Sequence, residues 1–360
     1  MNYEARVAKV KEKFLADGVE ALLVSKGTDI RYLSGFTGEA GVALLVLTDK
    51  KNYFITDGRF TNQAKMETTG MEIILWKSGS GLYKEGGELL KELGIKRAAI
   101  DCGEISHADY LTLTGTWGQE VEDSKPYITT LRMVKDADEL ALIRKACDIT
   151  EQSFLALLKL VKPGQTEKEI RNLLEYEFRK RGSVDVSFAT IVASGPENGG
   201  NPHASLTDRK VQQGDMITID FGASYEGYCS DMTRTFAIGD PGEKLKEIYR
   251  VVYEAKKAAE AALHVGAIAK DIDKAARDVI VNAGYELPHG PGHGFGLDIH
   301  EDPFLGFRNT YEMEENVVHT IEPGIYVPGT GGIRIEDDYL IKGSGAECLT
   351  PNITNELIIL

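Results

Sequence analysis

The stretch MITIDFGASYEGYCSDMTRTF, residues 216–236, decides how the larger part of this chain folds. Its apolar start predicts a strand that ends at Asp220, and the turn-prone residues 222–227 lead into a second strand that carries Asp231. The two aspartates stand eleven positions apart, which suits two carboxylates that face each other across a hairpin. For two aspartates alone, the alternative that Asp220 caps a turn and Asp231 is solvated stays open.

Three histidines lie close together further on, in PHGPGHGFGLDIHEDP, residues 288–303. They are His289, His293 and His300, with glycine at every second position from 290 to 296. Glycines at this density disfavour a helix and let the backbone approach a ligand or another strand closely. Three imidazoles with so little bulk around them favour a binding or catalytic site over a structural role.

Two glutamates follow strand-like runs in HTIEPGIYVPGTGGIRIEDD, residues 319–338. They are Glu322 and Glu336, and isoleucine alternates with polar residues just before the second. Because side chains alternate between the two faces of a strand, Arg334 and Glu336 are expected on one face. Carboxylates on an apolar β background need a compensating charge, and a metal ion supplies it.

These motifs together contribute four carboxylates and one imidazole, from Asp220, Asp231, His293, Glu322 and Glu336. Two divalent cations would balance the four negative charges, so the set predicts a dinuclear metal site. Oxygen donors with one imidazole suit Mn²⁺ best, with Co²⁺, Fe²⁺ and Zn²⁺ as alternatives. Ca²⁺ fits less well because the sequence has no EF-hand-like loop.

The same motifs resemble those of the creatinase/prolidase/aminopeptidase P family of pita-bread metallopeptidases. The likeness rests on DFGASYEGYCSDMTRTF, HGPGHGFGLDIHEDP, TIEPGIY and GGIRIEDD, and it runs from about residue 130 to the end. The preceding part resembles the family's creatinase-like N-terminal domain. The resemblance implies an α+β fold with a pseudo-duplicated pita-bread catalytic domain at residues 130–360, preceded by an α/β creatinase-like domain at residues 1–125. It also implies a homodimer.

The resemblance further implies what individual residues do. The positions that match the five donors bind two metal ions in this family, and four others line its active site: His203, His289, His300 and Arg334. We expect Glu322 to take a proton from water and to pass it to the leaving nitrogen. His203, in the loop SGPENGGNPHAS (194–205), and His300 are expected to donate to the substrate carbonyl and to steady the oxyanion. His289 is expected at the substrate, while Arg334 holds either a substrate carboxylate or the metal-ligand carboxylates.

The implied reaction is metal-dependent hydrolysis of the bond between a first residue and proline. We expect an Xaa-Pro aminopeptidase that acts on proline-containing peptides, and the alternative is a prolidase restricted to Xaa-Pro dipeptides. A methionine aminopeptidase would not need the first 120 residues, while creatinase or a dead binding module would have lost some of the five donors. Two plainer alternatives are that His203 only caps its loop and that Arg334 only balances acidic charge.

Two further patterns bear on domain organisation. Through residues 1–122, helical and strand-like segments alternate, as in an α/β domain with a mixed or parallel sheet. A short strand-like piece within residues 123–138 marks the join. Beyond it, the helix-like segments 161–182 and 263–284 superpose at an offset of 102 residues, which predicts a duplicated α+β unit.

The composition bounds the classes of partner. The chain has 360 residues, of which 42% are hydrophobic and 27% charged, as expected of a globular protein with real cores. Its net charge of −15, without a basic run, disfavours nucleic acid and anionic membranes as partners. No apolar stretch approaches the ~20 residues of a membrane span and the start has no apolar signal core, so a cytoplasmic protein is expected. The four cysteines lie far apart and predict neither disulfides nor a zinc site.

Overall fold

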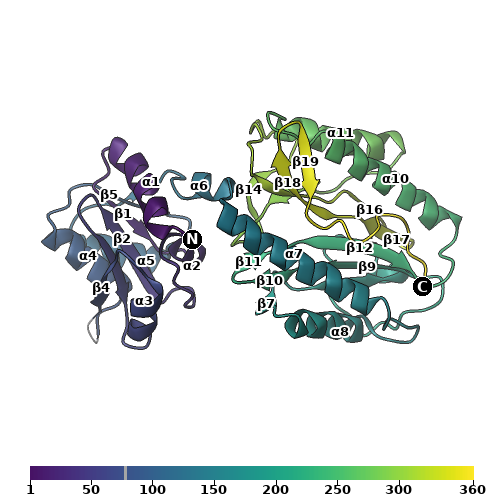
Figure 1. Ribbon diagram of the computed structural model, residues 1–360, viewed down its shortest axis with the longest axis horizontal. Coiled ribbons are helices and arrows are strands. Elements are labelled where there is room, and N and C mark those ends of the chain that lie inside the picture. The colour runs from purple at the N-terminus through teal and green to yellow at the C-terminus, as the bar shows by residue number, and fades with distance from the viewer. Residues whose placement is uncertain (77–78) are drawn as a thin grey trace. The chain divides into compact units, whose positions relative to one another are not determined.

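A computed structural model describes residues 1–76 and 79–360 of the chain. It divides into two compact units, Met1–Arg132 and Met133–Leu360 (Figure 1). No helix in these described stretches is long and apolar enough to cross a bilayer. The two units have different architectures, and the candidate site residues all belong to the second.

The short helix α6 (Thr129–Met133) lies at the division between the units. The sequence had led us to expect a strand-like piece here, and that expectation was wrong. The backbone N–H groups of Thr130 and Arg132 donate to the carbonyls of Pro126 and Ile128, four residues earlier. These local bonds close helical turns and leave the segment outside any sheet ladder.

The first unit is built on one six-stranded sheet with the order β4-β3-β2-β1-β5-β6. β1 pairs antiparallel with β2 and parallel with β5, so the sheet is mixed. Its strands are β1 (Ala21–Val24), β2 (Ala43–Thr48), β3 (Asn52–Thr56), β4 (Glu72–Leu75), β5 (Ala98–Ile100) and β6 (Glu122–Asp123). The helices before α6 are α1 (Tyr3–Ala16), α2 (Gly27–Ser34), α3 (Thr61–Glu67), α4 (Leu82–Glu92) and α5 (His107–Trp117).

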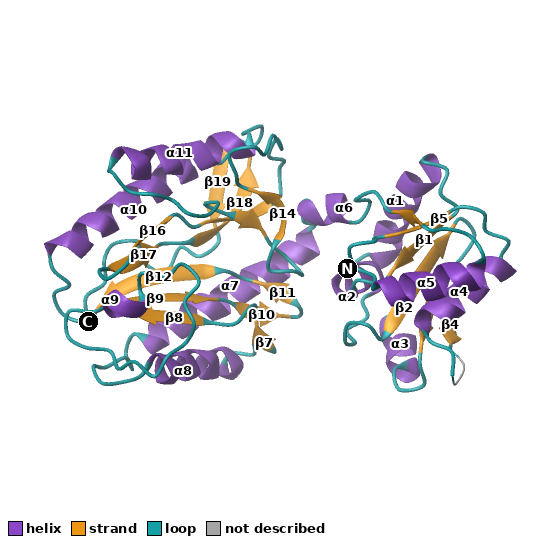
Figure 2. Ribbon diagram, turned by 180° about the vertical axis from the view of Figure 1, so that it is seen from behind, coloured by secondary structure: helices purple, strands orange, loops and turns teal. Residues whose placement is uncertain are grey.

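Helices cover both faces of this sheet (Figure 2). Leu44 and Val46 of β2 pack in one core with Leu90 of α4 and Leu113 of α5. Leu45, on the opposite face, is also fully buried, and β2 contacts α1 and α2 as well. A strand covered on both faces is apolar along its whole length, which is why β1 and β2 are continuous hydrophobic runs in the sequence.

The second unit contains two copies of one helix–helix–strand pattern, as the repeat predicted. The first copy has α7 (Ala137–Leu157), α8 (Glu167–Lys180), β8 (Ile191–Ser194), β9 (Met216–Phe221) and β12 (Met232–Ala237). The second copy has α10 (Glu243–Ala261), α11 (Ala269–Asn282), β13 (His293–Gly294), β15 (Val318–Ile321) and β18 (Asp337–Lys342). α8, β8 and β9 are followed 102 residues later by α11, β13 and β15.

Backbone hydrogen bonds repeat at the same offset. The N–H of Gly164 donates to the carbonyl of Val211 at 2.8 Å, and the N–H of Gly266 donates to that of Met313 at 2.8 Å. Each helix pair also packs on the strands of its own copy (Figures 1 and 2). In the first copy, Phe154 of α7 stacks on Phe221 of β9 with ring centroids 5.0 Å apart. The predicted duplication is thus confirmed in the hydrogen bonds as well as in the element order.

The remaining short elements extend or join the two copies. They are β7 (Asp185–Val186), α9 (Gly195–Asn198), β10 (Ala223–Tyr225), β11 (Tyr228–Cys229), β14 (Glu301–Phe304), β16 (Gly324–Val327), β17 (Gly331–Arg334) and β19 (Gly345–Cys348). β10 and β11 lie in a sheet with β7, whereas β16 and β17 pair with each other. Each of these two pairs continues a longer hairpin beyond a break in its strands.

Both long hairpins break at the positions of predicted metal ligands. In the first copy, the β9–β12 and β10–β11 ladders keep one register, which places Asp231 opposite Gly222 in the break. In the second copy, the β15–β18 and β16–β17 ladders keep one register, which places Glu322 opposite Glu336. The expected hairpin is therefore present, but Asp231 lies in its break and not within its second strand.

The break beside Asp231 leaves no room for a side chain at Gly222. A Cβ atom there would lie 1.9 Å from the carbonyl oxygen of Ser230, which is backbone and cannot swing away. We expect Gly222→Ala to lower the free energy of unfolding by about 2 kcal/mol or more, because the two strands must separate. Denaturant unfolding measures this loss.

Gly306→Ala is the matched control in the same unit, because a Cβ at Gly306 meets nothing within 4 Å. Its free energy of unfolding should stay within about 0.5 kcal/mol of the unmodified protein. Unchanged stability of the Gly222 variant would contradict the steric argument for the break.

Candidate metal centre and active site

One cavity of about 360 Å³ in the second unit collects every residue that the sequence singled out. Its lining includes all nine predicted site residues: His203, Asp220, Asp231, His289, His293, His300, Glu322, Arg334 and Glu336. These positions span more than 130 residues of sequence, so the fold and not local spacing brings them together.

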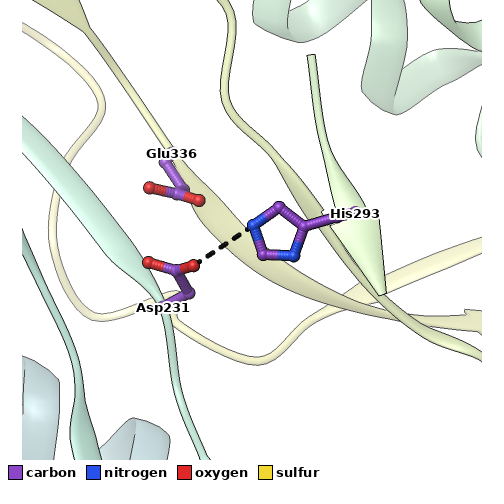
Figure 3. A group of neighbouring side chains, drawn as sticks. All are labelled: Asp231, His293 and Glu336. Atoms are coloured by element: carbon purple, nitrogen blue, oxygen red, sulfur yellow. Dashed lines mark ion pairs between the residues drawn. The ribbon is translucent and has the colours of Figure 1, made fainter. Parts of the chain in front are cut away.

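Asp231, His293 and Glu336 form the tightest group in the cavity. One ligand atom from each lies within 4.8 Å of the others, and all three residues are buried. Figure 3 shows the two carboxylates and the imidazole pointing toward one another from separate segments of the chain. The Nε2 atom of His293 lies 3.4 Å from Oδ2 of Asp231. This is a set of donors that can surround one cation.

Hydrogen bonds set the orientation of the His293 ring. Its Nδ1 lies 2.9 Å from the carbonyl oxygen of Gly294, so Nδ1–H donates there and Nε2 keeps its lone pair for the cavity. Nε2 is also 3.4 Å from Oε1 of Glu322. Gly292, next to the histidine, would place a Cβ 2.1 Å from the carbonyl oxygen of Thr320. The close strand approach that the glycine-rich motif predicted is therefore present.

Asp220 and Glu322 stand at the wall of the cavity beside this group. Their side chains are 15% and 16% exposed, more than the 1% of the whole Glu336 residue. Asp220 accepts a hydrogen bond from Nη2 of Arg334 at 2.5 Å. Glu322 accepts a long one from the hydroxyl of Thr320 at 3.4 Å. Glu322 is thus held by one long hydrogen bond from the protein.

Three carboxylate oxygens of the cluster are buried without a hydrogen-bond partner among the described residues. They belong to Asp220 (Oδ1), Asp231 (Oδ1) and Glu336 (Oε1). Burial first, and then the neighbouring carboxylates, raise the pKa of Asp231 and of Glu336 well above the usual range. Unpartnered anionic oxygens that repel one another are what a bound cation would satisfy, so the residues present fit a divalent metal centre.

Arg334 links the metal-ligand side of the cavity to its substrate side. Its Nη1 donates to the hydroxyl of Tyr326 at 2.6 Å and to the carbonyl of Pro202 at 3.1 Å, while Nη2 holds Asp220. Holding a ligand carboxylate is one of its two expected roles. His289 lies on the same network, with Nε2 3.1 Å from the Tyr326 hydroxyl.

Tyr326 is a residue that the sequence reasoning missed. It is buried enough that its pKa is raised to about 12, mainly by desolvation, so it stays a neutral phenol at ordinary pH. Along the strand it lies an even number of positions from Glu322, so alternation would have placed both side chains on one face. That signal was available in the quoted motif TIEPGIY.

The two remaining histidines are more exposed. His300 meets His293 edge to face, with ring centroids 4.5 Å apart. Burial, and then the neighbouring His293, lower the pKa of His300, which favours its neutral form. His203 has an exposed side chain with no hydrogen-bond partner among the described residues. Both rings are therefore free to donate to a molecule in the cavity.

Apolar side chains that no sequence motif predicted form a wall of the cavity. They are Phe188, Ala189, Ile191 and Ile299. Ile191 begins β8 and His293 begins β13, so the two occupy matching positions of the duplicated halves. The duplication thus supplies an imidazole to the cavity from one copy and a hydrocarbon side chain from the other.

Two family models match the chain. Residues 141–343 match the model of metallopeptidase family M24, and residues 6–134 match that of the Creatinase/Prolidase N-terminal domain. An Xaa-Pro dipeptidase of Pyrococcus horikoshii is 33% identical over 347 residues, which cover 96% of each chain.

Solved structures resemble the whole chain. An Xaa-Pro dipeptidase from Bacillus anthracis has a TM-score of 0.94 and 36% identity and covers 100% of both chains. An X-Pro aminopeptidase from Thermotoga maritima has a TM-score of 0.86 and 37% identity, covering 95% of this chain and 98% of that one. These likenesses confirm the expected α+β fold class, a creatinase-like N-terminal domain followed by a pita-bread catalytic domain.

Metal binding should be visible in the stability of the protein. We expect Mn²⁺ to raise the melting temperature and EDTA to reverse the rise, because an ion that binds only the folded state stabilises it. Asp231→Asn should lose most of this metal-induced shift, since it removes a buried carboxylate from the centre of the site. Thermal unfolding with and without metal, together with metal content, measures both effects.

The matched control is Asp273→Asn, which removes a buried carboxylate that pairs with the partly exposed Arg277, and neither residue lines the cavity. That variant should unfold at a lower temperature but keep the metal-induced shift. A full shift in the Asp231 variant would exclude Asp231 as a ligand.

The raised pKa values predict how pH acts on the metal-free protein. An acid whose pKa is higher in the folded than in the unfolded state holds more protons when folded, so stability falls as pH rises above about 4. The stability of Asp231→Asn should fall less steeply with rising pH than that of the unmodified protein. The difference in unfolding free energy between the variant and the unmodified protein should therefore grow from pH 5 to pH 7.5. Denaturant unfolding in EDTA at several pH values measures it, and a constant difference would contradict the cause given for these shifts.

Proposed function

This chain belongs to metallopeptidase family M24, and from that membership we propose that it hydrolyses the bond between an N-terminal residue and proline, as an Xaa-Pro aminopeptidase. The membership confirms the family that the motifs indicated. The observation that supports this proposal is the cavity, which is lined by five potential metal ligands, three further histidines and an apolar wall. The preference for proline is supported by relatives named for Xaa-Pro dipeptidase and X-Pro aminopeptidase activity. A homodimer stays a prediction.

One feature of the cavity favours peptides over dipeptides. Arg334 is the one guanidinium or ammonium group among the lining residues, and its donors already serve Asp220, Tyr326 and Pro202. A dipeptide would place the free carboxylate of its proline in this cavity. Among the lining residues, no Arg or Lys side chain is free to form an ion pair with that carboxylate. A longer peptide has an amide there and continues outward. The alternative, a prolidase, is supported by the relatives that are named dipeptidases.

We propose that the metal is a pair of Mn²⁺ ions held by Asp220, Asp231, His293, Glu322 and Glu336, with Co²⁺, Fe²⁺ and Zn²⁺ as alternatives. When bound, divalent ions of this kind polarise a carbonyl group and lower the pKa of water. Proton transfer and substrate binding are carried out by side chains of this protein.

Glu322 is the proposed proton carrier. It takes a proton from the attacking water on a carboxylate oxygen and delivers it to the proline nitrogen as the C–N bond breaks. Delivery is required because the nitrogen must gain a proton to leave as a neutral amine, since an amide anion is too basic to leave. Partial exposure to the cavity and one long hydrogen bond leave this carboxylate able to move a proton.

The histidines serve the substrate. His300 in its neutral form, and His203, each donate an N–H toward the carbonyl oxygen that becomes negative as water adds. His289, fixed by its contact with the Tyr326 hydroxyl, is placed to contact the substrate chain. The apolar wall around Ile191 and Ile299 suits the proline ring.

The deciding assay offers Ala-Pro, Ala-Pro-Ala and Ala-Ala-Ala to Mn²⁺-loaded protein and follows release of alanine, with EDTA-treated protein as control. We expect cleavage of Ala-Pro-Ala and none of Ala-Ala-Ala. Glu322→Gln should lower kcat by about 10²- to 10⁴-fold, because the proton path is lost. Metal content of the variant must be measured alongside, since Glu322 is also a proposed ligand.

Other outcomes have definite meanings. Cleavage of Ala-Pro alone would establish a prolidase. No cleavage of any proline peptide by protein with confirmed bound metal would refute the proposed reaction.

A further inference from the structure

The loop that carries His203 is hydrogen-bonded at both ends to the carboxylate of one buried residue, Glu167. Glu167 is 0% exposed and lies at the first position of α8, whose N-cap is Thr166. Its Oε1 accepts from the backbone N–H and the hydroxyl of Ser194, each at 2.8 Å. Its Oε2 accepts from the side-chain amide of Asn198 at 2.8 Å and from the N–H and hydroxyl of Thr207 at 3.0 and 2.6 Å. Both ends of residues 195–207 are thus tied to one side chain.

The duplication provides an internal comparison. α11 begins at Ala269, the position that matches Glu167 in the second copy. Both helices start with the same backbone contacts to a following segment, through the bridges of Thr166 with Lys210 and of Ile268 with Glu312. The start of α11 therefore forms without a carboxylate at this position. The carboxylate of Glu167 is thus not required to start the helix, and its function is specific to the first copy. The first copy differs here in its β8–β9 connection, which carries His203 and contains no strand, whereas the matching connection of the second copy contains β14.

The far side of the loop reaches the catalytic cavity. The carbonyl of Pro202, the residue before His203, accepts from Nη1 of Arg334 at 3.1 Å. Arg334 in turn holds Asp220. The loop therefore runs between Glu167 at its base and the metal-ligand network at its tip. The His203 ring has no protein hydrogen bond within the described stretches, so its place over the cavity depends on the loop backbone.

We propose that Glu167 is a positioning residue that holds this loop so that His203 can donate to the substrate carbonyl. The inference rests on the proposed function, in which His203 acts on the oxyanion. Glu167 touches neither substrate nor metal ligands and acts through Ser194, Asn198 and Thr207.

Glu167→Gln is the sharpest change, because it keeps the size of the side chain and replaces one acceptor oxygen by a donor. The NH₂ group of the glutamine must then face the backbone N–H of Ser194 or that of Thr207, neither of which can accept a hydrogen bond. One end of the loop is released while the other stays tied. A displacement of about 1 Å at an oxyanion donor lowers the rate by up to about 10²-fold.

The test is a double-mutant cycle of Glu167→Gln and His203→Ala with Ala-Pro-Ala as substrate. We expect Glu167→Gln alone to lower kcat by about 10- to 100-fold with little change in KM. In the His203→Ala background it should lower kcat no further, because its effect passes through that ring. A merely structural residue would give the same loss in both backgrounds.

Glu151→Gln is the matched control. Glu151 is 1% exposed and accepts from the backbone N–H and the side-chain amide of Asn352, at 2.5 and 2.7 Å, outside the cavity. It should lose stability as Glu167→Gln does, yet keep kcat. Equal kcat losses in both backgrounds, an unchanged kcat for Glu167→Gln, or an unchanged kcat for His203→Ala would each overturn the proposal.

Hydrogen exchange separates this proposal from the proposed function. Glu167→Gln should speed exchange of backbone amides in residues 194–207, whereas Glu151→Gln should speed exchange near residue 352. If the unmodified protein cleaves no proline peptide, the proposed function fails, and the exchange pattern still decides whether Glu167 holds the loop. Unchanged exchange in residues 194–207 would refute it.

Discussion

The mutual repulsion of four carboxylates in one cavity is the constraint on which the second unit depends. Asp231 and Glu336 are almost fully buried, and three oxygens of the cluster have no hydrogen-bond donor among the described residues. Burying such groups costs free energy that protein hydrogen bonds do not recover here, so either bound protons or a cation must offset it. Neighbouring groups orient these side chains: Thr233 donates to Glu336, Arg334 donates to Asp220, and Nδ1–H of His293 donates to the carbonyl of Gly294.

The duplicated fold brings these carboxylates together. Each copy forms a long hairpin with a break, and the breaks hold Asp231 in one copy and Glu322 with Glu336 in the other. A break in a ladder is a sensible place for a ligand, because the backbone there is not committed to its partner strand and the side chain can turn into the cavity. Two copies of one architecture therefore yield one centre.

The copies have also diverged where chemistry needs asymmetry. Ile191 lines the cavity at the position that His293 occupies in the second copy, so one copy contributes a hydrocarbon side chain there and the other contributes a metal-type imidazole. Ala269 likewise matches Glu167, whose five accepted hydrogen bonds hold the β8–β9 loop, a connection without a strand, whereas the matching β13–β15 connection contains β14. The two copies share one scaffold. The positions at which their residues differ are those that line the apolar wall, bind metal or hold the loop.

The sequence by itself determined the local elements, the duplication and the chemistry of the donors. The continuous apolar runs Ala21–Val24 and Ala98–Ile100 are the strands β1 and β5, and the offset of 102 residues held for helices, strands and single hydrogen bonds, because these depend on patterns within short windows. Residue type likewise restricted the set of metal ligands. Only the tertiary structure decided that nine side chains share one cavity, that Tyr326 joins His289 to Arg334, and that Phe188 and Ile299 line the apolar wall. These contacts join residues far apart in sequence, and no local pattern records which strands the fold brings side by side.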